Sequence, residues 1–271
     1  INTEESGDLD GNHDHQWFID PLDGTLNYAH GVPFYCVSVA YAYKGKLALG
    51  VVYDPTRDEC FCAEHGHGAK LNGQPIQVSN FQDLIDCMLF TGFPNNKWGS
   101  PTDNTDNFLR FSQLSQTVRR LGSAALAIAY VASGRLDGFW EVEINQWDVA
   151  AGGLIASEAG AVVTDVYGNP DFLLKPVTMV GANPTIHKQM LEVLAKVRAE
   201  YSQSPASIMT NSRLKKIQTA VLCFSKNQDY LRVEIPKGIY SGHTPTRLVR
   251  KKTTARIPNM IAHVPDITFV K

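Results

Sequence analysis

The chain has 271 residues, of which 44% are hydrophobic and 19% charged, and its formal net charge is −2. These values are typical of a soluble globular protein with a substantial core. No uncharged run approaches the ~20 residues that a transmembrane helix needs to span a bilayer. The five cysteines form an odd and sparse set. We therefore expect a cytoplasmic protein in a reducing compartment, without disulfides or membrane association.

The charge is divided unevenly along the chain. Residues 1–205 hold 13 Lys and Arg against 24 Asp and Glu, whereas residues 206–271 hold 12 against 3. A linker-like stretch rich in Ser and Pro, residues 201–207, lies at the change. We therefore predict a domain over 1–205 and a separate basic extension over 206–271. Because the first residues include neither an initiator Met nor a signal peptide, we expect the chain to begin inside a longer protein.

The first half of the chain predicts mainly strands. An apolar run at residues 17–19 ends in Asp20-Pro21-Leu22-Asp23-Gly24-Thr25, a pattern typical of a strand followed by a turn. Aromatic and β-branched residues predict further strands, and Lys44-Gly45-Lys46 predicts a hairpin turn between two of them. The predicted strands cover residues 34–43, 47–53 and 59–63.

The second half predicts helices separated by short strands. An Ala-rich stretch that ends in Gly predicts a buried helix over residues 121–134. A second helix is predicted over 148–159, beginning at Asp148, and an amphipathic one over 184–199. Short strands are predicted at 138–141, 161–165 and 178–181. Paired antiparallel strands with interspersed helices favour an α/β sandwich over a parallel doubly wound sheet.

The segment Asp20 to Thr25 is the first candidate site. Asp, Pro and Gly are turn residues, so an isolated segment of this kind is often only a solvated turn. Here Asp20 directly follows an apolar strand, which holds its carboxylate on a rigid element. Gly24 permits close approach of a ligand, and residues 24–27 open a helical turn whose N–H groups suit an anion. Carboxylates beside an anion repel it unless hard cations such as Mg²⁺ lie between them.

Three further positions have both a structural and a functional interpretation. Asp148 at a helix start is either a plain cap or a cation ligand. Arg119, with its neighbour Arg120 before a predicted helix, belongs either to a surface ion pair or to an anion site. Glu141 is either a solvated strand end or part of the site.

Taken together, these segments resemble the inositol monophosphatase family of magnesium-dependent, lithium-sensitive phosphatases. The resemblance covers about residues 1–200 and is strongest to bacterial SuhB-type members. It rests on three elements in order, namely Thr3-Glu4-Glu5-Ser6-Gly7, the segment from Trp17 to Asn27, and the segment from Trp147 to Gly160. The family's fold is a layered α-β-α-β-α sandwich with largely antiparallel sheets, which we expect here.

The resemblance implies a ligand set for two or three Mg²⁺ ions. Glu4, Asp20 and the backbone carbonyl of Leu22 would hold one ion, and Asp20, Asp23 and Asp148 a second. Glu4 and Thr25 would position and activate a metal-bound water, and Asp20 would bridge the two ions. Glu4, Thr25 and Asp20 are therefore the catalytic residues that the resemblance implies. The residues implied to contact substrate are Leu22, Asp23, Gly24, Thr25, Arg119, Ser123, Ala124, Glu141 and Asp148.

The implied reaction is hydrolysis of a small-molecule phosphate monoester, myo-inositol monophosphate, to inositol and phosphate. Fructose 1,6-bisphosphate, histidinol phosphate and a 3′-phosphoadenosine nucleotide are alternative substrates. A different alternative is a transcription antitermination factor, because SuhB-type proteins associate with NusA and RNA polymerase. The resemblance also implies a homodimer.

Two features depart from the family. Its members carry a pair of N-terminal helices before the Glu-Glu element, which this chain lacks. The segment 206–271 has no counterpart, and its basic clusters fit either nucleic-acid binding or a loosely ordered basic segment.

Overall fold

The computed structural model of the chain describes residues 1–5, 7–8, 14–94 and 104–203. The predicted boundary at residue 205 and the basic extension lie outside the described residues. None of the helices in the described ranges has the length and apolar character of a membrane span.

The N-terminal strands form one eight-stranded sheet in the order β2-β1-β3-β4-β5-β6-β7-β8. Neighbours are antiparallel except β1 and β3, which run parallel. In β4 alternate side chains are buried, as expected for a strand with one face on the core. The strands are β1 (Asn2–Thr3), β2 (Gly7–Asp8), β3 (His15–Asp23), β4 (Cys36–Tyr43), β5 (Lys46–Asp54), β6 (Glu59–Glu64), β7 (Ala69–Leu71) and β8 (Gln74–Pro75).

A second, five-stranded sheet has the order β10-β9-β11-β13-β12. Its β10-β9-β11 part is parallel, and β11, β13 and β12 pair antiparallel. The sheet is therefore mixed rather than largely antiparallel. Its strands are β9 (Met88–Thr91), β10 (Thr117–Arg119), β11 (Gly138–Glu141), β12 (Val162–Thr164) and β13 (Met179–Ala182).

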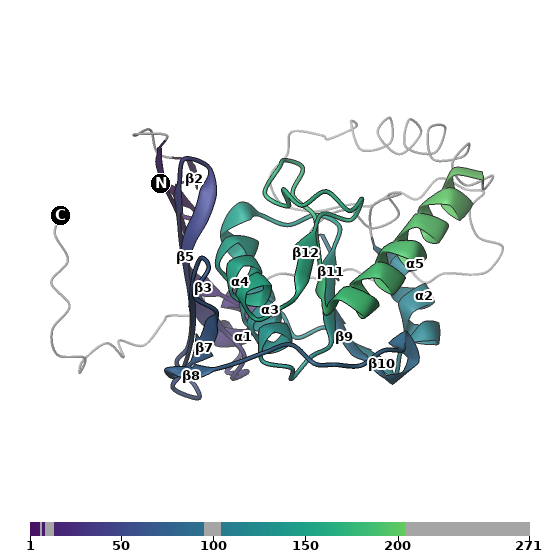
Figure 1. Cartoon of the computed structure of the whole chain (residues 1–271), viewed down its shortest axis with the longest axis horizontal. Helices are drawn as coiled ribbons and strands as arrows, with labels where there is room; N and C mark the ends of the chain where they lie inside the picture. The colour runs from purple at the N-terminus through teal and green to yellow at the C-terminus, as the bar shows by residue number, and fades with distance from the viewer. Residues whose placement is uncertain (6, 9–13, 95–103, 204–271) are drawn as a thin grey trace, which may run out of the picture. The chain divides into compact units, whose positions relative to one another are not determined.

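Helices and sheets alternate in layers (Figure 1). Helices α3 (Ala124–Ala132) and α4 (Gln146–Glu158) lie between the two sheets, and α2 (Thr105–Leu114) and α5 (Pro184–Gln203) lie against the second sheet. The short helix α1 (Thr25–Ala29) follows β3, and a 3₁₀ turn, η1 (Leu84–Asp86), precedes β9. The described residues thus form four of the five expected layers, β-α-β-α. None of the described helices covers the remaining face of the first sheet (Figure 1).

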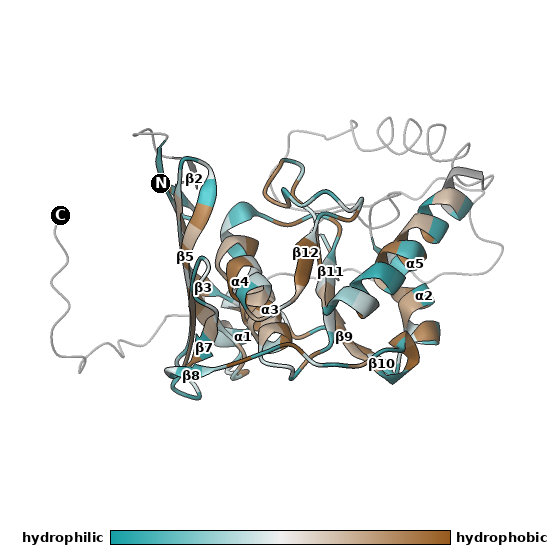
Figure 2. Ribbon diagram, viewed as in Figure 1, coloured by the Kyte–Doolittle hydropathy of each residue, from teal (hydrophilic) through white to brown (hydrophobic). Residues whose placement is uncertain are grey.

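The core divides into two apolar clusters, one on each face of the second sheet. The larger surrounds α3 and the middle of α4, residues 149–156, which are buried because Ala and Gly let the helices pack closely between the sheets. The smaller lies beneath α5 and includes Trp140, Ile186 and Met190. In Figure 2, α3 and β12 are mostly hydrophobic whereas hydrophilic and hydrophobic segments alternate on α5, as its predicted amphipathic pattern requires.

Several predicted boundaries need correction. The helix predicted over 121–134 begins at Ala124, because Gly122 has a positive φ and Ser123 is extended. The helix predicted to begin at Asp148 begins two residues earlier, at Gln146, because Asn145 and not Asp148 is its N-cap. The strand predicted from residue 34 begins at Cys36. Strands β9 and β10 and helix α2 were not predicted from the sequence.

Candidate metal centre

Asp20 and Asp23 reach the same cavity because β3 is irregular between them. In a regular strand, residues three apart point to opposite faces. Here Asp20 lies opposite Ser38 and Asp23 opposite Cys36, two positions apart on β4, so one extra residue is accommodated between the two aspartates. The backbone N–H of Leu22 donates to Asp20 Oδ1 at 2.9 Å and fixes that carboxylate.

Gly24 makes the turn that follows. Its φ is +95°, and a Cβ at this position would lie 3.0 Å from the carbonyl oxygen of Phe34. Only glycine accommodates both the backbone angle and the close approach. The turn leads into α1, where Thr25 Oγ1 donates to the carbonyl oxygen of Leu22 at 2.9 Å. Gly24 and Thr25 both line the cavity, as does Leu22.

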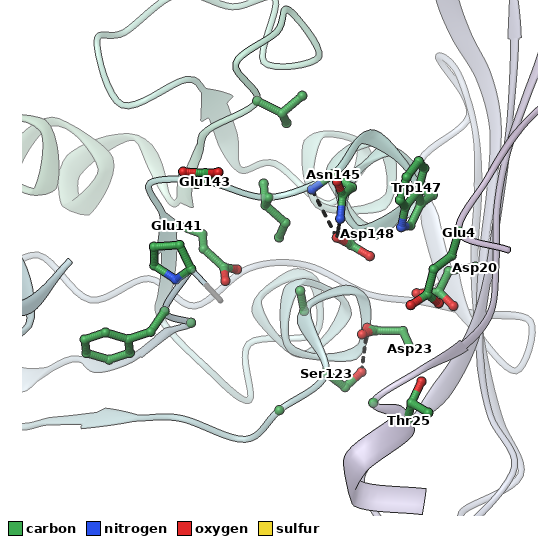
Figure 3. A pocket seen from close by; sticks show the side chains of 18 of the residues that line it. Glu4, Asp20, Asp23, Thr25, Ser123, Glu141, Glu143, Asn145, Trp147 and Asp148 are labelled. Atoms are coloured by element: carbon green, nitrogen blue, oxygen red, sulfur yellow. Dashed lines mark hydrogen bonds between the residues drawn. The ribbon is translucent and has the colours of Figure 1, made fainter. Parts of the chain in front are cut away.

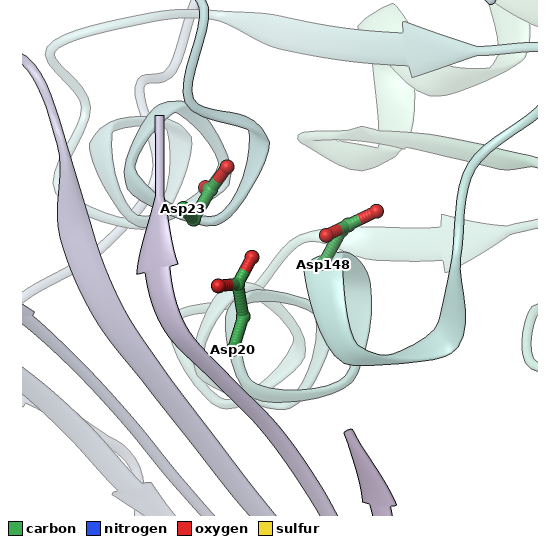
Figure 4. A group of neighbouring side chains, drawn as sticks. All are labelled: Asp20, Asp23 and Asp148. Carbon is green, nitrogen blue, oxygen red and sulfur yellow. The ribbon is translucent and has the colours of Figure 1, made fainter. Parts of the chain in front are cut away.

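Asp148 approaches from the other side, in the first turn of α4. Its carboxylate, with those of Asp20 and Asp23, forms a group in which one oxygen of each lies within 4.8 Å of the others (Figure 4). This spacing suits three ligands around one cation. Sequence analysis predicted these three residues as one ligand set, and the structure brings them together.

Glu4, the residue that follows β1, joins the cluster. Its backbone N–H donates to the carbonyl oxygen of Ile19 at 3.3 Å, which continues the parallel pairing of β1 with β3. Glu4 therefore lies beside Asp20, and Figure 3 shows their carboxylates together. The predicted ligands from three distant segments thus meet in one place.

Burial raises the pKa of every carboxyl in this cluster. Desolvation, followed by the hydrogen bond and charge of Asp20, raises the pKa of Glu4 from 4.5 to about 7. Desolvation and then the charge of Asp23 raise the pKa of Asp148 from 3.8 to about 8. The pKa values of Asp20 and Asp23 are raised as well, mainly by burial. A divalent cation would offset the charge repulsion, and an all-oxygen donor set is the kind that Mg²⁺ prefers.

The cluster forms one wall of a cavity of about 870 Å³. Segments from both sheets and from the starts of α1, α3 and α4 contribute to it. Besides the residues above, its lining includes Gly92, Phe93, Arg120, Ser123, Ala124, Glu141, Glu143 and Lys175.

Glu141 lies deep in this cavity at the end of β11 and is 8% exposed. Its Oε2 atom has no hydrogen-bond partner among the described residues. Burial, followed by the charges of Asp148 and Asp23, raises its pKa well above the usual range. Gly92 makes room for it, since a Cβ there would lie 1.9 Å from Glu141 Oε1. A buried acceptor without a partner suits a ligand hydroxyl.

Ser123 and Ala124 also line the cavity, at the start of α3. Ser123 is 1% exposed and its Oγ donates to Asp23 Oδ2 at 2.7 Å (Figure 3). The hydroxyl of Ser123 is therefore engaged with a candidate cation ligand.

Arg119 does not join the residues that line the cavity. It ends β10, is exposed, and donates to Thr117 Oγ1 at 3.0 Å. Its neighbour Arg120 lines the cavity instead, with its guanidinium 5.2 Å from the centre of the Phe93 ring.

Sequence reasoning missed Lys175 and Gly92 as cavity residues, and from the pair Arg119-Arg120 it assigned Arg119 to the substrate, whereas Arg120 lines the cavity. It also missed Asn27, whose Nδ2 donates to the carbonyl oxygens of Phe34 and Leu121 and so ties α1 to the segment before α3. The pair of adjacent arginines indicated an anion site but not which of the two residues would face it. Lys175 and Gly92 lie outside any recognisable pattern.

A layered α/β sandwich with a carboxylate cluster in a cavity between its sheets defines a candidate cation-dependent enzyme. The model of the inositol monophosphatase family matches residues 1–203, and the chain belongs to that family. It is 45% identical over 201 residues to the Nus factor SuhB of Pseudomonas aeruginosa, covering 72% of this chain and 73% of that protein. It is 39% identical over 194 residues to the inositol-1-monophosphatase of Mesorhizobium japonicum, covering 71% and 73%.

Among solved structures, the inositol monophosphatase from Anabaena (Nostoc) sp. PCC 7120 matches with a TM-score of 0.69 and 42% identity, covering 72% of this chain and 77% of that one. The predicted family and fold class are therefore confirmed. Membership of this family supports a phosphatase activity for the chain.

Proposed function

We propose that the chain is a Mg²⁺-dependent phosphomonoesterase that hydrolyses myo-inositol monophosphate to inositol and phosphate. The observation that carries this proposal is the group formed by Asp20, Asp23 and Asp148, whose oxygens lie within 4.8 Å of one another in a cavity large enough for a sugar phosphate. Family membership supports the reaction class.

In this proposal, Glu4, Asp20 and the carbonyl of Leu22 hold one Mg²⁺, and Asp20, Asp23 and Asp148 hold a second. When bound, such ions supply Lewis acidity toward the phosphoryl oxygens and lower the pKa of water. The raised pKa values of these carboxyls support the assignment. Without a cation, burial and mutual charge repulsion favour the protonated carboxyls, and a bound cation would offset that repulsion.

Glu4 is the proposed general base for the attacking water. Its carboxylate lies beside that of Asp20 in the cluster (Figure 3), where it would accept a proton from a water held there. Thr25 donates its own hydroxyl hydrogen to Leu22, so the lone pairs of Thr25 Oγ1 remain to accept a hydrogen bond from that water. Glu4 Oε and Thr25 Oγ1 would thus orient the water between them.

Substrate contacts are proposed on two sides of the cavity. Backbone N–H groups of Gly24 and Thr25 would receive the phosphate. The carboxyl of Glu141, buried and without a partner among the described residues, would receive an inositol hydroxyl. Arg120 brings a positive charge to the same cavity.

The test is steady-state hydrolysis by the full chain with myo-inositol monophosphate, fructose 1,6-bisphosphate, histidinol phosphate and 3′-phosphoadenosine phosphate. We expect turnover only with Mg²⁺, inhibition by millimolar Li⁺, and the highest kcat/KM for the inositol ester. Undiminished turnover after complete chelation contradicts the metal assignment. A higher kcat/KM for another ester contradicts the substrate and keeps the reaction class.

A second candidate function rests on the 45% identity to a protein named Nus factor SuhB. We propose that this chain associates with NusA and RNA polymerase in transcription antitermination. The test compares co-purification of NusA with the parent chain and with the variant Asp148→Asn. This variant removes a cation ligand and should be inactive as a phosphatase, so the comparison separates the two functions. Retained association by the inactive variant supports this second role, and no association by either contradicts it.

A further inference from the structure

Three donors converge on one oxygen of Asp23. Ser123 Oγ and the backbone N–H of Ala125 each donate to Asp23 Oδ2 at 2.7 Å, and Cys36 Sγ lies 3.8 Å from the same atom. Asp23, Ser123 and Cys36 are all buried. The backbone N–H of Ala124 also contributes to the hydrogen bonding of this carboxylate, and Oδ2 itself has little capacity left for a further donor.

The role of Ser123 differs from that expected of a serine before a helix. Ser123 occupies the N-cap position of α3 with an extended backbone, but its side chain makes no capping hydrogen bond. The carboxylate of Asp23, from another element, takes the N–H of Ala125 instead. The hydroxyl of Ser123 thus serves the carboxylate rather than the helix or a ligand.

We propose that Ser123 is a positioning residue that holds the Asp23 carboxylate in the orientation required for cation binding. This inference rests on the proposed function in that Asp23 is a Mg²⁺ ligand. Without the hydroxyl, Oδ2 keeps the N–H of Ala125 and the weak thiol donor of Cys36, and the carboxylate gains freedom to turn. Loss of a hydrogen-bond partner to a metal ligand typically weakens metal affinity about 10- to 100-fold.

The test is calorimetric titration of the metal-free full chain with Mg²⁺ in the absence of substrate. We expect Ser123→Ala to weaken at least one binding phase by about 10- to 100-fold. Ser123→Thr keeps the hydroxyl and should retain the parental affinity within about threefold, or ~0.65 kcal/mol. Ser115→Ala is the matched control, because Ser115 is also buried and donates to the carbonyl oxygen of Phe111 outside the cavity.

Melting temperature without metal is measured for each variant, because Ser123 opens a helix. If Ser123→Ala does not fold, Ser123→Cys, which keeps the side-chain volume and only a weak donor, takes its place with the same expectation of weakened affinity.

Parental Mg²⁺ affinity in a folded Ser123→Ala or Ser123→Cys overturns the proposal. A raised KM with unchanged Mg²⁺ affinity also overturns it, and favours the substrate contact predicted from the sequence. A parent chain that binds no Mg²⁺ overturns both this inference and the proposed function. If the parent binds Mg²⁺ but hydrolyses no phosphate ester, and Ser123→Ala weakens binding, the proposed function fails while the positioning role stands.

Discussion

The Oδ2 atom of Asp148 accepts hydrogen bonds from the backbone N–H of Asn145 at 3.1 Å and from its side-chain Nδ2 at 3.2 Å. These contacts form part of a capping box at the start of α4. Asp148 therefore belongs both to the helix cap and to the carboxylate group in the cavity. The two interpretations that its sequence position allowed are not exclusive, and they can be separated by experiment.

Asp148→Asn should separate them. The amide keeps an oxygen that can accept from Asn145, so the free energy of unfolding without metal should not fall by more than ~1 kcal/mol. Above pH 5.5 it should rise, because the raised pKa of Asp148 no longer opposes folding. The negative charge and a hard oxygen ligand are lost, and removal of such electrostatic stabilisation typically lowers kcat by about 10²-fold or more. Thermal denaturation and kcat over a Mg²⁺ titration measure the two effects.

The matched control for this variant is Asp165→Asn. Asp165 accepts hydrogen bonds from the backbone N–H groups of Tyr167 and Asn169 and does not line the cavity. It should keep parental turnover. If Asp148→Asn also stays within about threefold of the parent at saturating Mg²⁺, or ~0.65 kcal/mol on the barrier, Asp148 is only a cap.

Glu141→Gln should affect substrate binding and leave cation binding unchanged. Gln has nearly the same shape and fits the space beside Gly92, so the fold should be retained. The raised pKa keeps Glu141 neutral, and a hydrogen bond between neutral groups contributes about 0.5–1.5 kcal/mol, which predicts a rise in KM of roughly 2- to 10-fold. Initial-rate kinetics give KM and calorimetry gives the Mg²⁺ affinity. An unchanged KM would remove Glu141 from the substrate site.

The metal-free protein should become less stable as the pH rises from 5.5 to 8.5. The pKa of Asp148 is raised to about 8 and that of Glu4 to about 7, so the folded state holds more protons than the unfolded state across this window. Stability then decreases with pH, because the unfolded carboxyls have already ionised near pH 4. We expect Tm to fall by roughly 3 °C or more, corresponding to ~1 kcal/mol.

Burial lowers the pKa of His187, which makes a contribution of opposite sign near pH 6.5. Two comparisons therefore isolate the carboxylate cluster in that measurement. The pKa values of Asp54 and Glu158 are lowered by their hydrogen bonds, so both remain ionised throughout the window and contribute no slope. Saturating Mg²⁺ should flatten the dependence, and Asp148→Asn should reduce it in the metal-free state. A Tm that rises with pH in the metal-free parent and in Asp148→Asn alike would contradict the assignment.

Deletion of residues 207–271 should leave the catalytic centre intact. Among the residues that the structure describes, those that line the cavity lie between Glu4 and Val177, and the family match ends at residue 203. We expect Mg²⁺ affinity and kcat/KM within about threefold of the full chain. A truncated protein that folds but does not bind Mg²⁺ would contradict the predicted domain boundary.

The sequence predicted the site better than the elements that support it. Asp20, Asp23 and Asp148 were identified because each lies in a short, distinctive segment, and the structure brings their carboxylates together. The irregularity in β3 that turns Asp20 and Asp23 to one face could not be read from their spacing, since three positions in a regular strand would separate them.

Elements of the second sheet were missed for physical reasons. The strand Met88–Thr91 has four residues and pairs in parallel on both sides, so it shows no alternation that would distinguish it from a buried loop. Arg120 rather than Arg119 lines the cavity, a difference of one position that depends on where β10 ends.

Asp20 and Asp23 lie in β3 and Asp148 lies in α4. These two elements are far apart in the sequence, and many of the residues that form the core lie between them in the sequence. No partly synthesised or partly folded chain can present the group of Asp20, Asp23 and Asp148 before α4 has packed against the first sheet. A cation that binds this group binds the native state alone, and stabilises it by RT ln(1 + [L]/Kd). Cation occupancy therefore reports completed folding, and it is expected to slow unfolding rather than to accelerate the early steps of folding.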